Sequence, residues 1–290
     1  MKIRDRVISG ISSFKTLPAM AERLLVLINN PDAEAAELTN VIQLDPALTA
    51  NVLKAANSAF LGFQEPIDSI AEASFRIGTK WIYQLALSSL VYSNLRTPAR
   101  GYDMTAEDFW KHSIAVAVMT DNLCKLLNIR DNGAIYTGGL VHDIGKLVMQ
   151  ESVEEFIDEI EELVDKNNIS FEEAEEQVMG VDHTEAGAML AEHWHFPERI
   201  MEIIRWHHQP DHTEHSNPGI DIVHVADVIC LLEGFGLGRD GLKYRASEQA
   251  MVRLKLTSTV VEQATSLLLE SIENVEHIFT GRTAASPIGR

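Results

Sequence analysis

The adjacent residues His142 and Asp143 are the strongest chemical signal in this chain of 290 residues. They lie within the apolar run LVHDIGK at residues 140–146, whose hydrophobic residues recur at helical spacing. An unpaired imidazole and carboxylate at the margin of an apolar core would cost several kcal/mol. A divalent cation that binds both side chains would offset this cost. The doublet therefore predicts a metal site.

Two upstream residues are candidates for the same ion. Asp108 and His112 are four residues apart, so on one helix their side chains face the same side, as two ligands of a shared ion must. Asp108 has a second interpretation, because Thr105 and Asp108 also fit the first and fourth positions of a helix-capping box. Both interpretations are open from the sequence.

Downstream candidates lie at the ends of predicted helices or inside an apolar one. His183 stands at a predicted helix start, and His207 and His208 end the helix that begins near residue 197. Adjacent side chains on a helix diverge by about 100°, so this pair could bind two different ions, or one ion and its substrate. The alternative interpretation is that both histidines are exposed residues that cap the helix. Asp227 is an acid among strongly apolar residues, and His224, one turn earlier, is expected to orient a ligand through a hydrogen bond.

Apolar residues recur at helical spacing almost throughout, and no stretch alternates as a strand would, so the predicted fold is all-α. Asp45 before Pro46, Ser152 with Glu155 and Ser170 with Glu173 are typical of helix starts, and Gly78 of a helix end. The predicted helices span 18–30, 33–43, 46–57, 69–77, 79–93, 105–128, 132–149, 153–167, 171–179, 183–194, 197–208, 219–233 and 257–273.

The chain is predicted to form two helical lobes that meet near residues 96–101, where RTPARG breaks the pattern. All eleven histidines lie at position 112 or later, so residues 1–100 form a histidine-free N-terminal lobe. Residues 101–290 then form the metal-capable lobe with its C-terminal helices. The glycine-rich segment 234–241 lacks the Lys-Ser/Thr of a phosphate-binding loop and is interpreted as a flexible connection.

Charge and composition exclude several classes of function. The net charge is −19, and residues 151–200 hold 16 acidic and 2 basic residues, so a nucleic-acid partner is not expected. The acidic stretch is better explained by a solvated helix face than by an acidic docking surface. No apolar run approaches a membrane span, and Cys124 and Cys230 lack a C-x-x-C partner, so we expect a cytoplasmic protein that does not enter a membrane.

The order of these residues resembles the HD superfamily of metal-dependent phosphohydrolases, in which a histidine, the His-Asp doublet and a late aspartate hold a metal. The resemblance places His112, His142, Asp143 and Asp227 in that set. The resemblance extends to the larger ligand set of the HD-GYP branch, onto which Asp108, His183, His207 and His208 map. Asp108 stands where that branch has glutamate. Lys146 matches the lysine of that branch that contacts phosphate. Gln209-Pro210-Asp211 replaces the Gly-Tyr-Pro triplet, so cleavage of a cyclic dinucleotide is not implied.

The N-terminal lobe resembles an HDOD domain. The resemblance is carried by Leu17-Pro18, by IQLDPAL at 42–48, by AANS at 55–58 and by residues 70–78, and it extends over roughly residues 10–210. Members of that family are bacterial signalling or regulatory proteins that have often lost the metal ligands of the HD fold. This chain departs from them by retaining a nearly complete set.

The resemblance and the donor types together define the expected chemistry. Nitrogen and oxygen donors without thiolate favour iron or manganese, with nickel or zinc as alternatives, and Asp143 would bridge a dinuclear pair. The expected reaction is hydrolysis of a phosphoester or nucleotide, with Asp143 and Lys146 as catalytic residues. Two alternatives are a non-catalytic signalling module that binds a protein partner and a di-iron oxygenase of the HD fold.

Overall fold

We analysed a computed structural model of the chain. It describes residues 2–14, 17–30, 34–58, 61, 63, 65–94, 96–131, 133–212, 217–241 and 244–280. Residues 33 and 132, where two of the predicted helices begin, lie outside these ranges. Over the described residues the protein is all-α, with no strand and only one isolated β-bridge, between Ala99 and Met104. The predicted fold class is confirmed.

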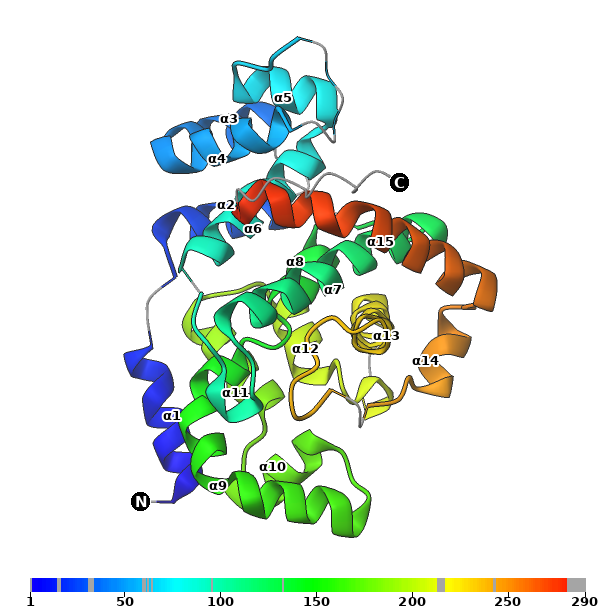
Figure 1. Ribbon diagram of the computed structural model, residues 1–290. Coiled ribbons are helices and arrows are strands. Elements are labelled where there is room, and N and C mark those ends of the chain that lie inside the picture. The colour runs from blue at the N-terminus through cyan, green and yellow to red at the C-terminus, as the bar shows by residue number, and fades with distance from the viewer. Residues whose placement is uncertain are drawn as a thin grey trace, which may run out of the picture.

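The first part of the chain forms six helices, of which α3, α4 and α5 lie together at the top of the molecule in Figure 1. Local sequence explains several of their ends. The Asp45 carboxylate accepts the backbone N–H groups of Ala47 and Leu48, which starts α4, and Gly78 ends α5 with a φ of 101°. The six are α1 (Ile3–Ser13), α2 (Ala19–Asn29), α3 (Ala35–Gln43), α4 (Pro46–Ala56), α5 (Ile70–Ile77) and α6 (Thr79–Asn94).

In the second part of the chain, α7 and α8 lie near the centre of the molecule in Figure 1, and α9 and α10 lie at its bottom. Ser170 and Glu173 form the predicted capping box at the start of α10. The elements are the 3-10 helix η2 (Arg100–Tyr102), α7 (Ala106–Leu126), α8 (Ala134–Val141), α9 (Gly145–Asn167), α10 (Phe171–Met179), α11 (His183–His193), α12 (Glu198–Trp206), the 3-10 helix η3 (Pro210–His212), α13 (Pro218–Leu232), α14 (Glu248–Arg253) and α15 (Ser258–Thr280).

Three features differ from the sequence-based prediction. The expected helix over 132–149 is broken by a turn at residues 142–144, so the His142-Asp143 doublet lies between α8 and α9 and not inside a helix. The expected helix start at Ser152 is wrong, because α9 continues through Ser152 and has non-helical backbone only at Phe156. The short helices α1 and α14 were not predicted.

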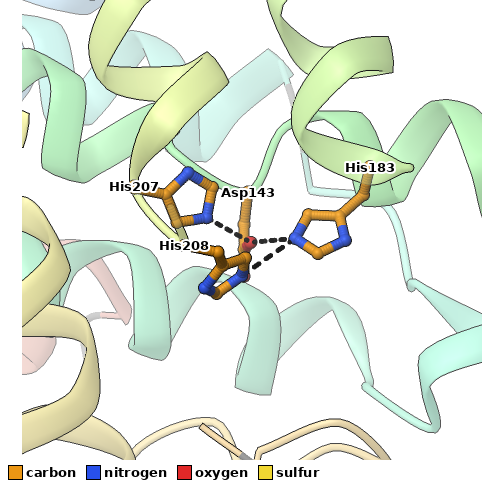
Figure 2. A group of neighbouring side chains, drawn as sticks. All are labelled: Asp143, His183, His207 and His208. Atoms are coloured by element: carbon orange, nitrogen blue, oxygen red, sulfur yellow. Dashed lines mark hydrogen bonds and ion pairs between the residues drawn. The ribbon is translucent and has the colours of Figure 1, made fainter. Parts of the chain in front are cut away.

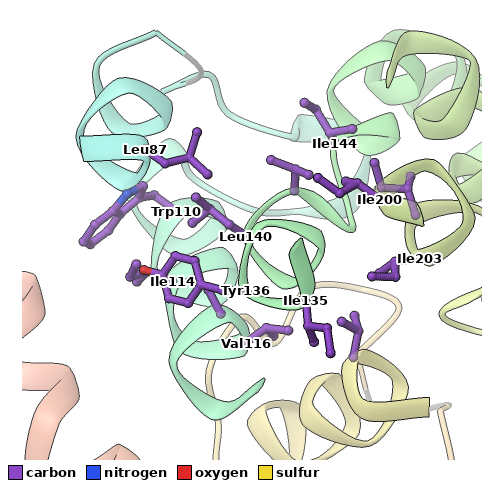
Figure 3. Close-up of a cluster of buried hydrophobic side chains, with 14 of the residues drawn as sticks. Leu87, Trp110, Ile114, Val116, Ile135, Tyr136, Leu140, Ile144, Ile200 and Ile203 are labelled. Atoms are coloured by element: carbon purple, nitrogen blue, oxygen red, sulfur yellow. The ribbon is translucent and has the colours of Figure 1, made fainter. Parts of the chain in front are cut away.

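One apolar core runs through both halves of the described chain. Figure 3 shows part of it, where Leu87 of α6, Ile114 of α7, Leu140 of α8 and Ile203 of α12 meet. The central helix α7 packs against α8, α13 and α15, and α15 in turn reaches α4. The core therefore fixes the helices that carry the site.

The first helix packs away from its sequence neighbours. Helix α1 lies against α9 and α11, and Arg4 forms an ion pair of 2.7 Å with Glu185 on α11. The first hundred residues thus contribute a helix to the second half of the molecule, and a division of the chain near residue 100 stays a prediction. None of the helices over the described residues is both long and apolar enough to cross a membrane.

Candidate metal centre

Seven of the eight predicted ligands lie together in one buried cluster. Five separate parts of the chain contribute them: His112 from α7, His142 and Asp143 from the turn before α9, His183 from the start of α11, His207 and His208 from the end of α12, and Asp227 from α13. Their side chains are at most 2% exposed. Figure 2 shows Asp143 among three of the imidazoles.

The turn that carries the doublet is set by a close contact with α11. A Cβ atom at Gly145 would collide with the carbonyl oxygen of His183 and lie 2.6 Å from the backbone nitrogen of Gly187. Glycine therefore lets the start of α9 approach the start of α11 more closely than any other residue would. This contact brings Asp143 beside His183.

Four imidazoles are held in one orientation by hydrogen bonds from Nδ1. The acceptors are Phe235 O for His112 (3.1 Å), Gly139 O for His142 (2.8 Å), a Glu175 carboxylate oxygen for His183 (2.7 Å) and Ile204 O for His207 (2.8 Å). Because carbonyl and carboxylate oxygens only accept, each Nδ1 carries the proton. In the neutral ring, Nε2 then keeps its lone pair, which is free to bind a cation.

The first group of donor atoms surrounds one oxygen of Asp143. The Nε2 atoms of His112 and His142 lie 3.2 Å from each other, and they lie 3.6 and 3.4 Å from Asp143 Oδ2. Asp227 Oδ1 is 3.2 Å from the same nitrogen of His112. Two nitrogen lone pairs and two carboxylate oxygens at these distances form a set of donors that could hold one cation.

The second group surrounds the other oxygen of Asp143. His183 Nε2 and His207 Nε2 lie 3.5 and 3.7 Å from Asp143 Oδ1, and His208 Nε2 is 3.1 Å from His183 Nε2. Asp143 Oδ1, His207 Nε2 and His208 Nδ1 are buried and lack a hydrogen-bond partner. Buried polar atoms without partners are rare and costly, so these three mark a place for a ligand.

The pKa values show that the cluster attracts positive charge. Burial alone would keep Asp143 neutral, but Lys146 and His142 lower its pKa well below the usual range. Burial is likewise outweighed at Asp227, where the neighbouring His112 and His142 lower the pKa to about 2. Burial lowers the pKa of His207 to about 4, so that ring is neutral and able to bind a metal. The two carboxylates therefore stay ionised without water to solvate them.

Glu175 is a functional partner that the sequence did not reveal. Its carboxylate accepts hydrogen bonds from Nδ1 and from the backbone N–H of His183, and from the hydroxyl of Tyr102 at 2.5 Å. Burial opposes protonation of His183, but Glu175 outweighs it and raises the pKa of the imidazole to about 9. A carboxylate behind a histidine in this way fixes the ring and increases its affinity for a cation.

Lys146 lies beside the cluster but does not face solvent. Its ammonium group is 2.6 Å from Asp143 Oδ2 and 2.6 Å from Asp240 Oδ2, and it lies 5.5 Å from the centre of the Tyr102 ring. Asp240, in the segment interpreted as a simple connection, is 1% exposed. Nearby, the ring of Tyr244 stacks on His208 with centroids 4.0 Å apart. Neither residue was singled out from the sequence.

Asp108 is the one predicted ligand that the structure does not bring into the cluster. It is exposed at the first turn of α7, where its carboxylate accepts a hydrogen bond of 2.6 Å from Thr105 and its N–H donates to the same hydroxyl. The capping interpretation is therefore the one that the structure shows. His224 donates to the carbonyl oxygen of His207 at 2.6 Å, so it supports the backbone of a ligand and not its ring.

Comparisons with known proteins identify the family of the chain. The family model of the HDOD domain matches residues 14–210. An uncharacterised protein of Treponema pallidum (strain Nichols) is 28% identical over 239 residues, which cover 80% of this chain. The chain spans about 45% of the length of that relative.

Solved structures with the same fold cover nearly the whole chain. An HDOD domain protein of unknown function from Geobacter sulfurreducens superposes with a TM-score of 0.71 at 23% identity, covering 96% of both chains. A Shewanella amazonensis SB2B protein, provisionally named a phosphohydrolase, gives 0.70 at 22% identity and covers 94% of this chain and 96% of its own. At these identities the likeness shows the fold, and the site must be argued from its own atoms.

Proposed function

Because the chain belongs to the HDOD domain family, we propose that it is a signalling protein whose second half holds a divalent transition-metal centre with phosphohydrolase activity. The observation that carries the proposal is the position of Asp143. Its two oxygens face two separate groups of imidazoles, and each group contains buried nitrogen atoms oriented toward it. In this position Asp143 would contribute one oxygen to each of two ions.

The donor set supports a dinuclear centre. One ion would be held by His112, His142, Asp143 and Asp227, and the second by Asp143, His183, His207 and His208. Imidazole and carboxylate donors without thiolate favour iron or manganese, with nickel or zinc as alternatives. The two aspartates carry two negative charges in the cluster, which compensate part of the charge of two divalent ions.

We infer the substrate class from the remaining residues around the cluster. Divalent cations activate water and stabilise charge on phosphoryl oxygens, which suits hydrolysis of a phosphoester or nucleotide. Lys146, which already holds two carboxylates, supplies the positive charge that binds the substrate phosphate. Glu175 keeps the His183 ring oriented, and Asp143 orders both groups of ligands.

Elemental analysis tests the metal centre. Protein purified without added metal or chelator should contain about two equivalents of transition metal per chain. Asp143→Asn should reduce the content severalfold, because the bridging charge is lost, while Asp158→Asn on the exposed face of α9 should leave it unchanged. A content near zero in the wild type that iron or manganese does not restore would contradict the proposal.

Turnover of a generic phosphoester tests the catalytic half. A nitrophenyl phosphoester should be hydrolysed by the metal-loaded wild type, and the rate should fall at least about a hundredfold in Asp143→Asn and in Lys146→Met. Asp158→Asn is again the matched control. Metal content and turnover are separate readouts, so a loaded protein without turnover rejects hydrolysis and keeps the metal centre.

A second candidate function is a binding module for a signalling protein. The observation that favours it is Phe75 on α5, which is 90% exposed at the end of the molecule far from the cluster, together with Leu44, which is 63% exposed. Metal bound tightly without hydrolysis would support this module or an oxygenase. Consumption of dioxygen by iron-loaded protein would distinguish the oxygenase from the module.

A further inference from the structure

The candidate centre is closed, and one segment lies directly over part of it. We define the cover as residues 235–241, which follow α13 after Gly234. The side chains of the cluster are at most 2% exposed, and Lys146 is 4% exposed. A substrate therefore reaches these groups only after a segment moves away.

The backbone of the cover rests on the first group of ligands. The carbonyl oxygen of Phe235 accepts the Nδ1 proton of His112. A Cβ atom at Gly236 would lie 2.5 Å from Cβ of His112, and the φ of Gly236 is 76°. At the far end, the N–H of Arg239 donates to the carbonyl oxygen of Tyr102 at 3.0 Å. These contacts place the backbone of the cover against His112, on the Nδ1 side of its ring.

Asp240 brings a negative charge to the residue that is expected to bind the substrate. Its Oδ2 atom lies 2.6 Å from Lys146 Nζ, and both side chains are buried. The other partner of Lys146 is Asp143, which is fixed in the cluster. Asp143 lies in the turn before α9, which packs tightly against α11 at Gly145. Asp240 lies in the cover, which is held by backbone contacts to His112 and Tyr102 and by an ion pair between Arg239 and Glu161.

Gly234 is a candidate hinge at the start of the cover. Gly234, between the end of α13 and the cover, has a φ of 86°, and a Cβ there would meet nothing within 4 Å. Its backbone is free to rotate without moving a packed side chain. Loss of the cover would uncover Lys146 and the ring of His112 together.

We propose that the cover is displaced by substrate, and that Asp240 occupies the position on Lys146 that an anionic, phosphate-like group of the substrate takes in the open site. The proposal rests on the proposed function for the role of Lys146. A carboxylate and a phosphate both offer anionic oxygens to an ammonium group, so each excludes the other. Asp240 thereby selects against neutral ligands, which cannot replace its charge.

Inorganic phosphate and trypsin test the cover on the full-length wild-type protein. Cleavage after Arg239 and after Arg245, mapped by mass spectrometry, reports opening because both sites lie in or beside the cover. Phosphate should accelerate cleavage at these sites severalfold, with or without manganese in the buffer. Cleavage that phosphate leaves unchanged or slows overturns the proposal.

Asp240→Asn gives the second readout. Without the competing charge, the variant should bind phosphate about tenfold more tightly in calorimetry and be cleaved faster in the absence of phosphate. Asp68→Asn, at an exposed aspartate before α5, is the matched control and should behave as wild type. Equal phosphate affinity in wild type and in Asp240→Asn overturns the proposal.

The two proposals fail in different ways. If the protein neither binds metal nor hydrolyses a phosphoester, the proposed function is wrong, while phosphate-dependent opening is still measurable in metal-free protein. If turnover is present but the cover does not respond to phosphate, the function stands and the role of Asp240 is wrong.

Discussion

At the scale of single residues, the cluster depends on hydrogen bonds behind the ligands as much as on the ligands. Each of four imidazoles donates its Nδ1 proton to a fixed acceptor, and three of those acceptors are backbone carbonyls. Only His183 uses a side chain, Glu175, which also receives the Tyr102 hydroxyl. Glu175 is therefore the one acceptor of the four that a point mutation can replace.

Glu175→Gln should weaken metal binding without unfolding the protein. The amide oxygen still accepts the His183 proton, but it lacks the negative charge that raises the affinity of the ring. We expect metal affinity to fall by about 10- to 100-fold, measured by competition with a fluorescent chelator. Glu176→Gln, exposed on the same helix, should have no effect. Equal affinities of the two variants would contradict the support role.

Glu172 predicts a pH dependence of stability. It is 5% exposed, and burial raises its pKa from 4.5 to about 7. The folded state therefore binds more protons than the unfolded state between these values, and the contribution of Glu172 to stability falls as the pH rises from about 4.5 to 7. Glu172→Gln should remove this pH-dependent loss of stability, because glutamine does not ionise.

Urea unfolding of the metal-free protein at pH 5 and pH 8 measures the effect. The difference in free energy of unfolding between Glu172→Gln and wild type should shift in favour of the variant by up to about 3 kcal/mol from pH 5 to pH 8. Glu173→Ala tests a different role at the next position, because Glu173 caps α10 and its loss should cost about 1 kcal/mol at both pH values. A Glu172→Gln difference that does not change with pH would show that the carboxyl titrates normally.

Residue types and their context predicted most of the cluster but, apart from His224, none of the residues that support it. The seven clustered ligands are histidines and acids in apolar surroundings, where a charged or polar side chain needs a partner. Glu175 was missed because it lies in FEEAEEQ, where it resembles the exposed acids beside it. Asp240 was missed because a glycine-rich segment gives no periodicity from which burial is predicted.

At the scale of elements, helical periodicity placed most helices within two residues of their observed ends. The exception that matters is the turn at 142–144. Its apolar residues keep the helical pattern, so no local signal marks the break. The cause is the contact of Gly145 with His183 and Gly187, which lies about forty residues further along the chain and is visible only in the folded molecule.

Two glycine substitutions test that contact. Gly145→Ala should destabilise the protein by about 1–3 kcal/mol or more, because the added methyl group meets backbone atoms of α11. Gly10→Ala is the opposite case, since it lies within α1 with nothing within 4 Å of an added Cβ, and it should stabilise by about 0.5–1 kcal/mol. Urea unfolding measures both, and a neutral Gly145→Ala would show that α9 and α11 separate easily.

At the scale of the whole molecule, the cluster brings together side chains from five parts of the chain. The apolar core packs these parts side by side, and the cluster adds polar contacts between them. Binding of a cation there acts on α7, α11, α12 and α13 and on the turn before α9 at once. Its binding energy adds to the stability of the folded state, since the unfolded chain does not form the site.

Removal of metal should therefore lower stability. At a free metal concentration about a hundred times the dissociation constant, the free energy of unfolding should exceed that of the chelated protein by about 2.7 kcal/mol. Differential scanning calorimetry before and after prolonged chelation measures the shift in melting temperature. Asp143→Asn should melt at the same temperature in both conditions, and a wild type insensitive to chelation would contradict a site built across these helices.

The burial of every donor atom also has a kinetic consequence. If the proposed centre holds an ion, the ion would leave only when the surrounding helices or the cover open, so its exchange with the medium would be limited by the protein and not by ligand substitution. A purified sample would then retain the metal acquired during folding, and the metal found in it would reflect the supply inside the cell more than the composition of the purification buffer.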